Sequence, residues 1–294
     1  MATSNREWRA ERLGPVRELA LPQGAVRYLS IGSGPAIVFV HGALVNANLW
    51  RKVVAELSAD FRCVTLDLPF GSHVVPMAPD ADLSPPAVAD LIADAIEALE
   101  LDDVTLVGND TGGAMCQLVV TRRSERIGAL VLTSCDAFDN CPPKLMKPIM
   151  PLLSRAALLK PALAPARSRA VQRAIFRALA KRPVEPEVLD AYALPAVTDA
   201  GVRRDLARLM AGLDKRHTLE AAERLPAFDK PAVIAWSRED RFFPAGHAER
   251  LAELLPQGRV EWIDDARTFS PEDQPDRVGR LVAEVAAQSS RAVA

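Results

Sequence analysis

The strongest chemical signal in the sequence is a glycine-rich turn with an aspartate at its centre. The apolar stretch Val104–Val107 has the pattern of a strand, and residues 108–113 (GNDTGG) lead from it directly into a helical pattern. A strand that ends in G-x-X-x-G-G and turns straight into a helix is typical of a nucleophile elbow, where small residues permit a strained turn. A carboxylate in the X position can attack carbon and form an ester. The pattern therefore predicts Asp110 as a nucleophile; the other interpretation is an ordinary helix N-cap.

A second signal is His41, which is followed by glycine and comes directly after Ala36–Val40, a run typical of a strand buried on both faces. This loop resembles the HG loop of the alpha/beta-hydrolase superfamily, in which His is usually structural. There, a backbone N–H just after HG and the one after the nucleophile form an oxyanion hole. The resemblance implies that Ala43 and Thr111 supply these groups, and that His41 and Trp50 lie beside the substrate.

A third signal follows the expected strand Ala232–Trp236, where a polar segment runs to Pro244. In the superfamily, the acid of the catalytic triad lies after a late strand in a D-x-x-x-P pattern. That pattern falls on Asp240 here, and the neighbouring Glu239 is the alternative. The resemblance therefore implies that Asp240 orients a catalytic base or binds water.

Alternating strand and helix patterns must position these residues. Residues 139–226 break the alternation, because they contain only helical patterns. This organisation predicts an α/β fold with a mostly parallel, doubly wound sheet, and the resemblance implies that it is the alpha/beta-hydrolase fold. Residues 1–138 and 227–294 would form its core, and residues 139–226 a helical cap inserted after the sixth strand. The expected strands are Ala25–Ile31, Ala36–Val40, Phe61–Leu66, Val104–Val107, Ala129–Thr133, Ala232–Trp236 and Arg259–Ile263.

The resemblance covers almost the whole chain, and an aspartate at the elbow narrows it to the branch of haloalkane dehalogenases and epoxide hydrolases. In that branch, water activated by a histidine hydrolyses the ester formed on the aspartate. That histidine belongs in the loop after the last strand, where this sequence has Ala266-Arg-Thr268-Phe and no histidine at all after His247. Threonine cannot accept a proton near neutral pH, and a positioned general base contributes about 10²–10⁴-fold to a rate.

Another histidine would have to replace the missing base. His73 is the best candidate, because it lies in the loop after the expected strand Phe61–Leu66, which the superfamily places near the pocket mouth. We therefore expect His73 or a rearranged group near Thr268 to serve as the base. His217 and His247 are expected at the surface.

Two further departures concern the substrate. Haloalkane dehalogenases commonly hold the leaving halide with a Trp directly after the nucleophile and an Asn directly after HG, where this chain has Thr111 and Ala43. Epoxide hydrolases use cap tyrosines to protonate the opening oxygen, and the expected cap holds a single one, Tyr192. We expect Tyr192 and Thr268 to border the substrate, although ordinary cap packing is the alternative for Tyr192.

Composition excludes several classes of protein. The 294 residues carry 36 Lys+Arg against 38 Asp+Glu, which gives no overall electrostatic case for binding nucleic acid. The four cysteines show no CxxC spacing, so neither a metal site nor a redox pair is indicated. The N-terminus is too polar for a signal peptide, and no apolar run approaches the roughly 20 residues of a membrane span. We expect a cytoplasmic protein that acts on a small molecule without a cofactor.

The charge is unevenly distributed along the chain. Residues 139–226 hold 16 Lys+Arg against 9 Asp+Glu, and the remainder holds 20 against 29. A solvated surface partly paired with the acidic core would explain this, and the alternatives are an anionic substrate, a membrane surface or a partner protein.

Together these patterns predict a cofactor-independent hydrolase of a small, largely apolar substrate, with Asp110 attacking carbon. One alternative keeps the fold but uses Asp110 as a general acid or base in an isomerase, cyclase or lyase, since a carboxylate in a dry pocket can have a raised pKa. The other is a catalytically impaired binding protein.

Overall fold

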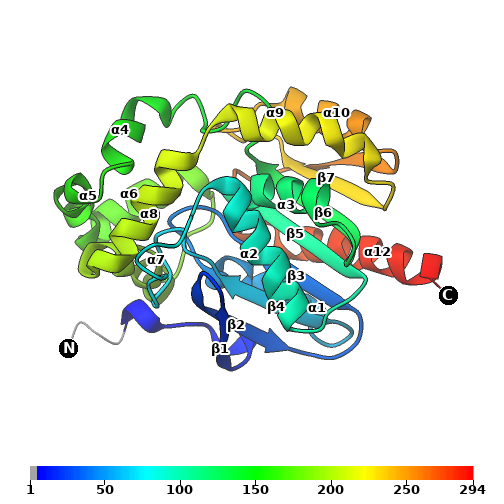
Figure 1. The fold of residues 1–294 in the computed structure, drawn as a ribbon, viewed down its shortest axis with the longest axis horizontal. Helices are drawn as coiled ribbons and strands as arrows, with labels where there is room; N and C mark the ends of the chain where they lie inside the picture. Colours follow the sequence, from blue (N-terminus) through cyan, green and yellow to red (C-terminus); the bar gives the residue numbers. More distant parts are fainter. Residues whose placement is uncertain (1–4, 294) are drawn as a thin grey trace.

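The computed structural model describes residues 5–293 and contains an eight-stranded sheet with helices on both faces (Figure 1). The strand order is β1-β2-β4-β3-β5-β6-β7-β8. Pairing is antiparallel between β1 and β2 and between β2 and β4, and parallel from there to β8. The strands are β1 (Val16–Leu21), β2 (Gly24–Ile31), β3 (Ala36–Val40), β4 (Arg62–Asp67), β5 (Val104–Asp110), β6 (Ile127–Cys135), β7 (Ala232–Ser237) and β8 (Gly258–Ile263).

Apolar side chains on both faces explain why the central strands form. β3 reads AIVFV and is buried at every position, as expected for a strand covered by helices on two sides. One face packs against α1 and α12, and the other against α2, α3 and α10 (Figure 1). These helices are α1 (Arg51–Leu57), α2 (Pro85–Ala98), α3 (Thr111–Arg122), α10 (Ala245–Leu254) and α12 (Pro275–Val293). Two apolar layers therefore hold the carboxyl ends of β3 and β5–β8 at one edge of the sheet.

Between β6 and β7 the chain forms helices joined by loops, with no strand among these residues, and we call this segment the helical insertion. Its helices α4 to α8 lie together at one end of the molecule, whereas α9 packs against α3 beside the sheet (Figure 1). We therefore propose that only the part before α9 serves as a cap. The helices are α4 (Met150–Leu153), α5 (Ala156–Leu163), α6 (Arg169–Leu179), α7 (Pro186–Thr198), α8 (Ala200–Gly212) and α9 (Lys215–Arg224).

The predicted fold class is confirmed, and one strand was missed. β1 (Val16–Leu21) reads VRELAL and leaves most of its side chains exposed, because it lies at the edge of the sheet. A strand at the edge of a sheet buries few side chains, so it needs little alternation of apolar and polar residues. Its sequence therefore gives only a weak indication that it forms a strand. Among residues 5–293, no helix is both long enough and apolar enough to cross a membrane.

Candidate active site

The turn between β5 and α3 has the geometry of a strained elbow. Asp110 adopts φ 57° and ψ −131°, a backbone conformation that residues other than glycine rarely take. The backbone of the loop after β3 comes so close to the elbow that neither Gly42 nor Gly112 could be replaced by a residue with a side chain. A Cβ on Gly112 would lie 2.3 Å from the carbonyl oxygen of His41, and one on Gly42 would lie 2.6 Å from Cβ of Asp110. The glycines of the two motifs thus let the loop after β3 contact the elbow directly.

Three hydrogen-bond donors converge on one oxygen of the Asp110 carboxylate. The N–H of Thr111 donates to Oδ1 over 2.6 Å, its hydroxyl over 3.0 Å, and the N–H of Ala43 over 3.3 Å. The two backbone donors, the N–H groups of Thr111 and Ala43, are the ones that the resemblance implies for an oxyanion hole. Burial raises the pKa of Asp110, and the same three hydrogen bonds oppose that rise. No hydrogen bond to Oδ2 is found among the residues that the structure describes, and Asp110 keeps part of its surface open.

A cavity of about 300 Å³ lies against Asp110. Asp110, Thr111 and Tyr192 are the only residues with polar side chains among those that line it, and no lysine, arginine or histidine is among them. The positive charge of the helical insertion therefore lies elsewhere. Apolar residues from the loop after β3, from the helical insertion and from the loops after β7 and β8 form the rest of the wall: Ala43, Leu44, Val45, Pro142, Pro143, Met146, Met150, Leu153, Leu163, Ala166, Ile175, Phe176, Ala178, Leu179, Ala193, Ala196, Met210, Leu213, Phe242 and Phe269.

Asp240 follows β7 and is held by backbone donors. Its Oδ1 accepts hydrogen bonds from the N–H groups of Phe242 (2.7 Å) and Phe243 (2.9 Å). Burial raises the pKa of Asp240, and these N–H groups together with the nearby hydroxyls of Ser134 and Thr268 lower it. The alternative acid, Glu239, instead lies at the surface in an ion pair with a lysine of the helical insertion.

Thr268 occupies a buried position between Asp240 and the elbow. Its side chain is fully buried, and its carbonyl oxygen accepts a hydrogen bond from Asn109, the residue before the proposed nucleophile, over 2.8 Å. A base at position 268 would thus be close to the carboxylate of Asp240 and to the residue that precedes Asp110. Thr268 itself does not line the cavity, so the expected contact with substrate stays a prediction.

Asp136, which the sequence analysis overlooked, lies beside the proposed nucleophile. It follows β6, is fully buried, and its Oδ2 is 3.4 Å from the Thr111 hydroxyl that also contacts Asp110. Burial raises the pKa of Asp136 well above its usual range, and the charges of Asp110 and Asp240 raise it further. The only available signal was an aspartate at the carboxyl end of a central strand, where open α/β sheets place functional groups.

His73 contacts the helical insertion and does not line the cavity. Its Nε2 lies 3.2 Å from Oδ2 of Asp205 in α8, both side chains are buried, and His73 is not among the cavity residues. The loop after β4 is tied to the helical insertion by this pair, so nothing in the geometry supports His73 as the substitute base. His217 in α9 and His247 in α10 do not line the cavity either.

His41 and Trp50 are both fully buried and lie outside the cavity wall, whereas Tyr192 lines it. Trp50 packs against Phe39 with ring centroids 5.1 Å apart. Tyr192 stacks on Phe176, and its hydroxyl has no hydrogen-bond partner among the described residues. Of these three expected substrate contacts, only Tyr192 is brought to the cavity.

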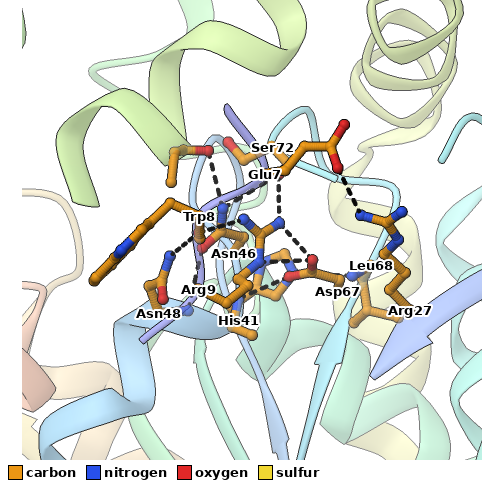
Figure 2. Close-up of polar contacts among 12 residues, drawn as sticks. Glu7, Trp8, Arg9, Arg27, His41, Asn46, Asn48, Asp67, Leu68 and Ser72 are labelled. Atoms are coloured by element: carbon orange, nitrogen blue, oxygen red, sulfur yellow. Dashed lines mark hydrogen bonds and ion pairs between the residues drawn. The ribbon is translucent and has the colours of Figure 1, made fainter. Parts of the chain in front are cut away.

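Polar contacts fasten the N-terminal segment and the loop after β3 together (Figure 2). Arg9 forms an ion pair with Asp67, and both side chains are almost fully buried. Asn48 accepts from the N–H of Ala10 over 2.9 Å and donates to the carbonyl of Trp8 over 3.1 Å. These bonds restrain the loop that carries Ala43.

His41 joins the loop after β3 to the loop after β4, since its Nε2 accepts a hydrogen bond from the N–H of Leu68 over 3.0 Å (Figure 2). Burial lowers the pKa of His41 to about 4, and its hydrogen bond with Gly42 opposes the shift. The ring is therefore neutral at physiological pH and acts as a structural acceptor.

His41 predicts a loss of stability in mild acid. The unfolded chain takes up a proton below about pH 6.5, whereas the folded protein resists protonation of His41 down to pH about 4. Between these two pH values the unfolded state binds more protons than the folded state. The free energy of unfolding therefore falls as the pH is lowered from about 6.5 to about 4, by about 3 kcal/mol at most. Urea unfolding at successive pH values measures the decline, and His41→Gln should remove this part of it. An identical pH dependence in both proteins would contradict the assignment.

Comparisons with known proteins agree with this fold. The model of the family described as "Alpha/beta hydrolase family" matches residues 37–281. "Haloalkane dehalogenase 2" of Mycobacterium tuberculosis is 27% identical over 268 residues, covering 89% of this chain and 91% of the relative. "Cis-3-alkyl-4-alkyloxetan-2-one decarboxylase" of Shewanella oneidensis is 25% identical over 263 residues, covering 86% and 82%. A solved haloalkane dehalogenase of Bradyrhizobium elkani has the same fold, with a TM-score of 0.78 at 18% identity over 95% of this chain and 99% of its own.

Proposed function

The chain belongs to the alpha/beta hydrolase family, and we propose that Asp110 attacks a carbon atom of a small apolar molecule and that water then hydrolyses the resulting ester. The convergence of three donors on Oδ1 of Asp110 carries this proposal. With Oδ1 held in this way, Oδ2 is the oxygen that forms the bond to carbon. In the ester, Oδ1 becomes the carbonyl oxygen, on which negative charge develops when water attacks. The N–H groups of Thr111 and Ala43 already point at that atom.

The cavity supports an uncharged substrate rich in alkyl groups. Its wall offers no cation to an anionic group, and methionine, leucine and phenylalanine side chains supply apolar contacts. Haloalkane dehalogenase 2, a relative of this chain, is named for an alkyl halide substrate. The anionic substrate, one of the alternatives suggested by the uneven charge, therefore has no support in the cavity wall.

Tyr192 favours a substrate whose leaving atom is oxygen. Burial raises the pKa of its hydroxyl well above the usual range, so the group remains protonated and can donate a hydrogen bond. Tyr192 lines the same cavity as Asp110. Its hydroxyl oxygen is buried close to Arg51 and Glu272 and has no hydrogen-bond partner among the described residues. When Oδ2 of Asp110 bonds to the carbon of a strained ring ether, the C–O bond breaks and an alkoxide is released. Rotation of the Tyr192 side chain into the cavity would let its hydroxyl donate a hydrogen bond to that alkoxide, which water then protonates.

The same geometry predicts a slow second step. The cavity wall contains no histidine, and Thr268 cannot serve as the missing base. We therefore expect the ester on Asp110 to accumulate. Incubation with hexene oxide or hexyl bromide, followed by intact mass spectrometry and peptide mapping, should detect one added hydroxyhexyl group or one added hexyl group, respectively, on the peptide that contains Asp110. An unmodified protein with every alkylating probe would count against the proposal.

Asp136 positions the hydroxyl of Thr111. That hydroxyl has one proton to donate, yet it contacts Oδ1 of Asp110 and Oδ2 of Asp136. Both contacts are hydrogen bonds only if one carboxyl is protonated. We infer that neutral Asp136 donates to Thr111, which in turn donates to ionised Asp110. The titratable groups that face Asp136 are Asp110, Asp240, Cys135 and Cys141, and no cation is among them.

Asp136→Asn tests this arrangement. The amide keeps a donor for Thr111 and should leave the elbow intact, but it removes the carboxylic acid. Wild-type protein is expected to show the carbonyl band of a protonated carboxylic acid in difference infrared spectra at a pH where exposed carboxyl groups are ionised, since burial raises the pKa of Asp136 well above its usual range. The band should disappear in Asp136→Asn and persist in Asp240→Asn. A band that survives in Asp136→Asn would contradict the role of Asp136.

The lack of a base also favours a second candidate, a lyase that opens a cyclic ester. The Shewanella relative is named a decarboxylase of an alkylated oxetan-2-one. Oδ2 of Asp110 would bond to the ring carbon that carries oxygen, and that C–O bond would break to release a carboxylate. Loss of carbon dioxide would then form the alkene and return the electron pair of the ester bond to Asp110. Neither step needs water or a base, and the alkene and carbon dioxide are measurable products.

A further inference from the structure

A run of exposed apolar side chains marks the helical insertion. Six large hydrophobic side chains are exposed among the described residues, and five of them lie between residues 145 and 175. Leu145 is 63% exposed, which is the highest value of the set. Exposed apolar side chains that gather in one stretch of the chain, rather than singly on many elements, indicate an interaction site. The five are Leu145, Ile149, Leu152, Leu158 and Ile175, and the sixth is Val16 on β1.

Exposed cations without ion-pair partners lie in the same stretch. Between Asp139 and Arg182 the sequence has ten basic residues and one acid. Four of the ten form ion pairs with aspartate or glutamate. For the other six, all exposed, no ion pair is found among the described residues: Lys147, Arg155, Lys160, Arg167, Arg173 and Arg177. We call these six cations and the five apolar side chains the basic apolar patch.

The basic apolar patch continues into the cavity. Ile175 is 48% exposed and also lines the cavity wall, so it lies at the rim. Met146, Met150 and Leu163 line the cavity from the same stretch of chain. Helices α4, α5 and α6 lie together at the end of the molecule away from the C-terminus (Figure 1). A molecule bound at this surface would thus be next to the route into the apolar site.

We propose that the basic apolar patch docks on an anionic phospholipid membrane, from which an apolar substrate passes into the cavity. Apolar side chains interleaved with lysine and arginine fit the interface of a bilayer, where the alkyl groups enter the lipid and the cations contact anionic headgroups. A second copy of this chain is disfavoured as the occupant, because it would bring six unpaired cations against six others. Docking does not depend on the chemistry proposed for Asp110, so vesicle binding tests it separately.

Flotation of the full chain with vesicles tests the proposal. Vesicles of phosphatidylcholine with about one third phosphatidylglycerol should bind the protein, more weakly as salt increases, whereas pure phosphatidylcholine vesicles should bind it poorly. Arg155→Gln and Arg173→Gln should each weaken binding about fivefold. Leu145→Ser and Leu158→Ser, which lie outside the cavity wall, should also weaken it.

Matched controls are available outside the patch. Val16→Ser removes the remaining exposed apolar side chain, and Lys230→Gln removes an exposed cation of the same charge. Neither should change vesicle binding. The proposal is overturned by equal binding to both vesicle types, by no binding, or by equal losses in the controls. Sedimentation without lipid that reveals a dimer lost in Leu145→Ser would show a second copy as the occupant and would also overturn it.

Discussion

Asp110→Asn is expected to abolish the covalent adduct and to reduce turnover of an alkyl substrate by at least about 10⁴-fold, the scale on which removal of a nucleophile acts. The amide oxygen can still accept the donors of Thr111 and Ala43, so the elbow keeps its hydrogen bonds. What changes is the atom that faces the cavity, because an amide nitrogen cannot attack carbon as a carboxylate oxygen does. Intact mass spectrometry after exposure to hexene oxide measures the adduct directly.

The substitution should leave folding intact. Asparagine tolerates a positive φ better than most residues, and Asp110 has φ 57°. Burial raises the pKa of Asp110, and no cation is among the groups that shift it. Replacing this buried carboxylate with a neutral amide is therefore expected to keep or increase the free energy of unfolding. Loss of the adduct in a protein that unfolds at the same or a higher urea concentration excludes misfolding as the cause.

The adduct, rather than the rate, separates the competing mechanisms. A general acid or base at position 110 would also lose activity in Asp110→Asn, but wild-type protein would then never gain the mass of an alkyl group. A wild-type adduct that maps to another residue, or one that persists in Asp110→Asn, would overturn the nucleophile assignment. A binding protein would show neither an adduct nor turnover.

The sequence predicts those parts of the site whose local geometry needs particular residues. The elbow needs glycine where the loop after β3 approaches it, and this requirement makes Gly112 and the position of Asp110 visible as a pattern. The buried run of β3 likewise predicts a central strand, because both faces must be apolar. Helices on both faces of a parallel sheet follow from the alternation of such runs with helical patterns.

Contacts between distant segments leave no such pattern. His73 pairs with Asp205, which lies 132 residues later in the chain, and no local signal indicates this partner. Asp136 likewise gains its environment from Thr111 and Asp110 on a neighbouring strand and helix. A titratable residue in a loop therefore reveals its role only when the fold shows what surrounds it.

Thr268→His is expected to raise the rate of ester hydrolysis by about 10²–10⁴-fold, the contribution of a positioned general base. Asp240 and Asn109 already surround this position: the hydroxyl of Thr268 lies near the carboxyl of Asp240, and the Thr268 carbonyl accepts from Asn109, next to Asp110. A histidine there would have an acid to orient it and an ester within reach. Because position 268 is fully buried, the larger ring should cost about 1–3 kcal/mol of stability through overpacking.

Two further variants make the result specific. Thr268→Gln also enlarges the side chain but supplies no base, so it should not speed hydrolysis. Adding Asp240→Asn to Thr268→His should reverse much of the gain, because the ring would lose its acidic partner. Decay of the alkylated protein, followed by mass spectrometry, measures each rate. If the ester decays no faster in Thr268→His than in wild type, the missing histidine does not limit hydrolysis. A cyclic ester tests the lyase instead. Release of alkene and carbon dioxide at the same rate in both proteins would favour the lyase, because that reaction needs no base.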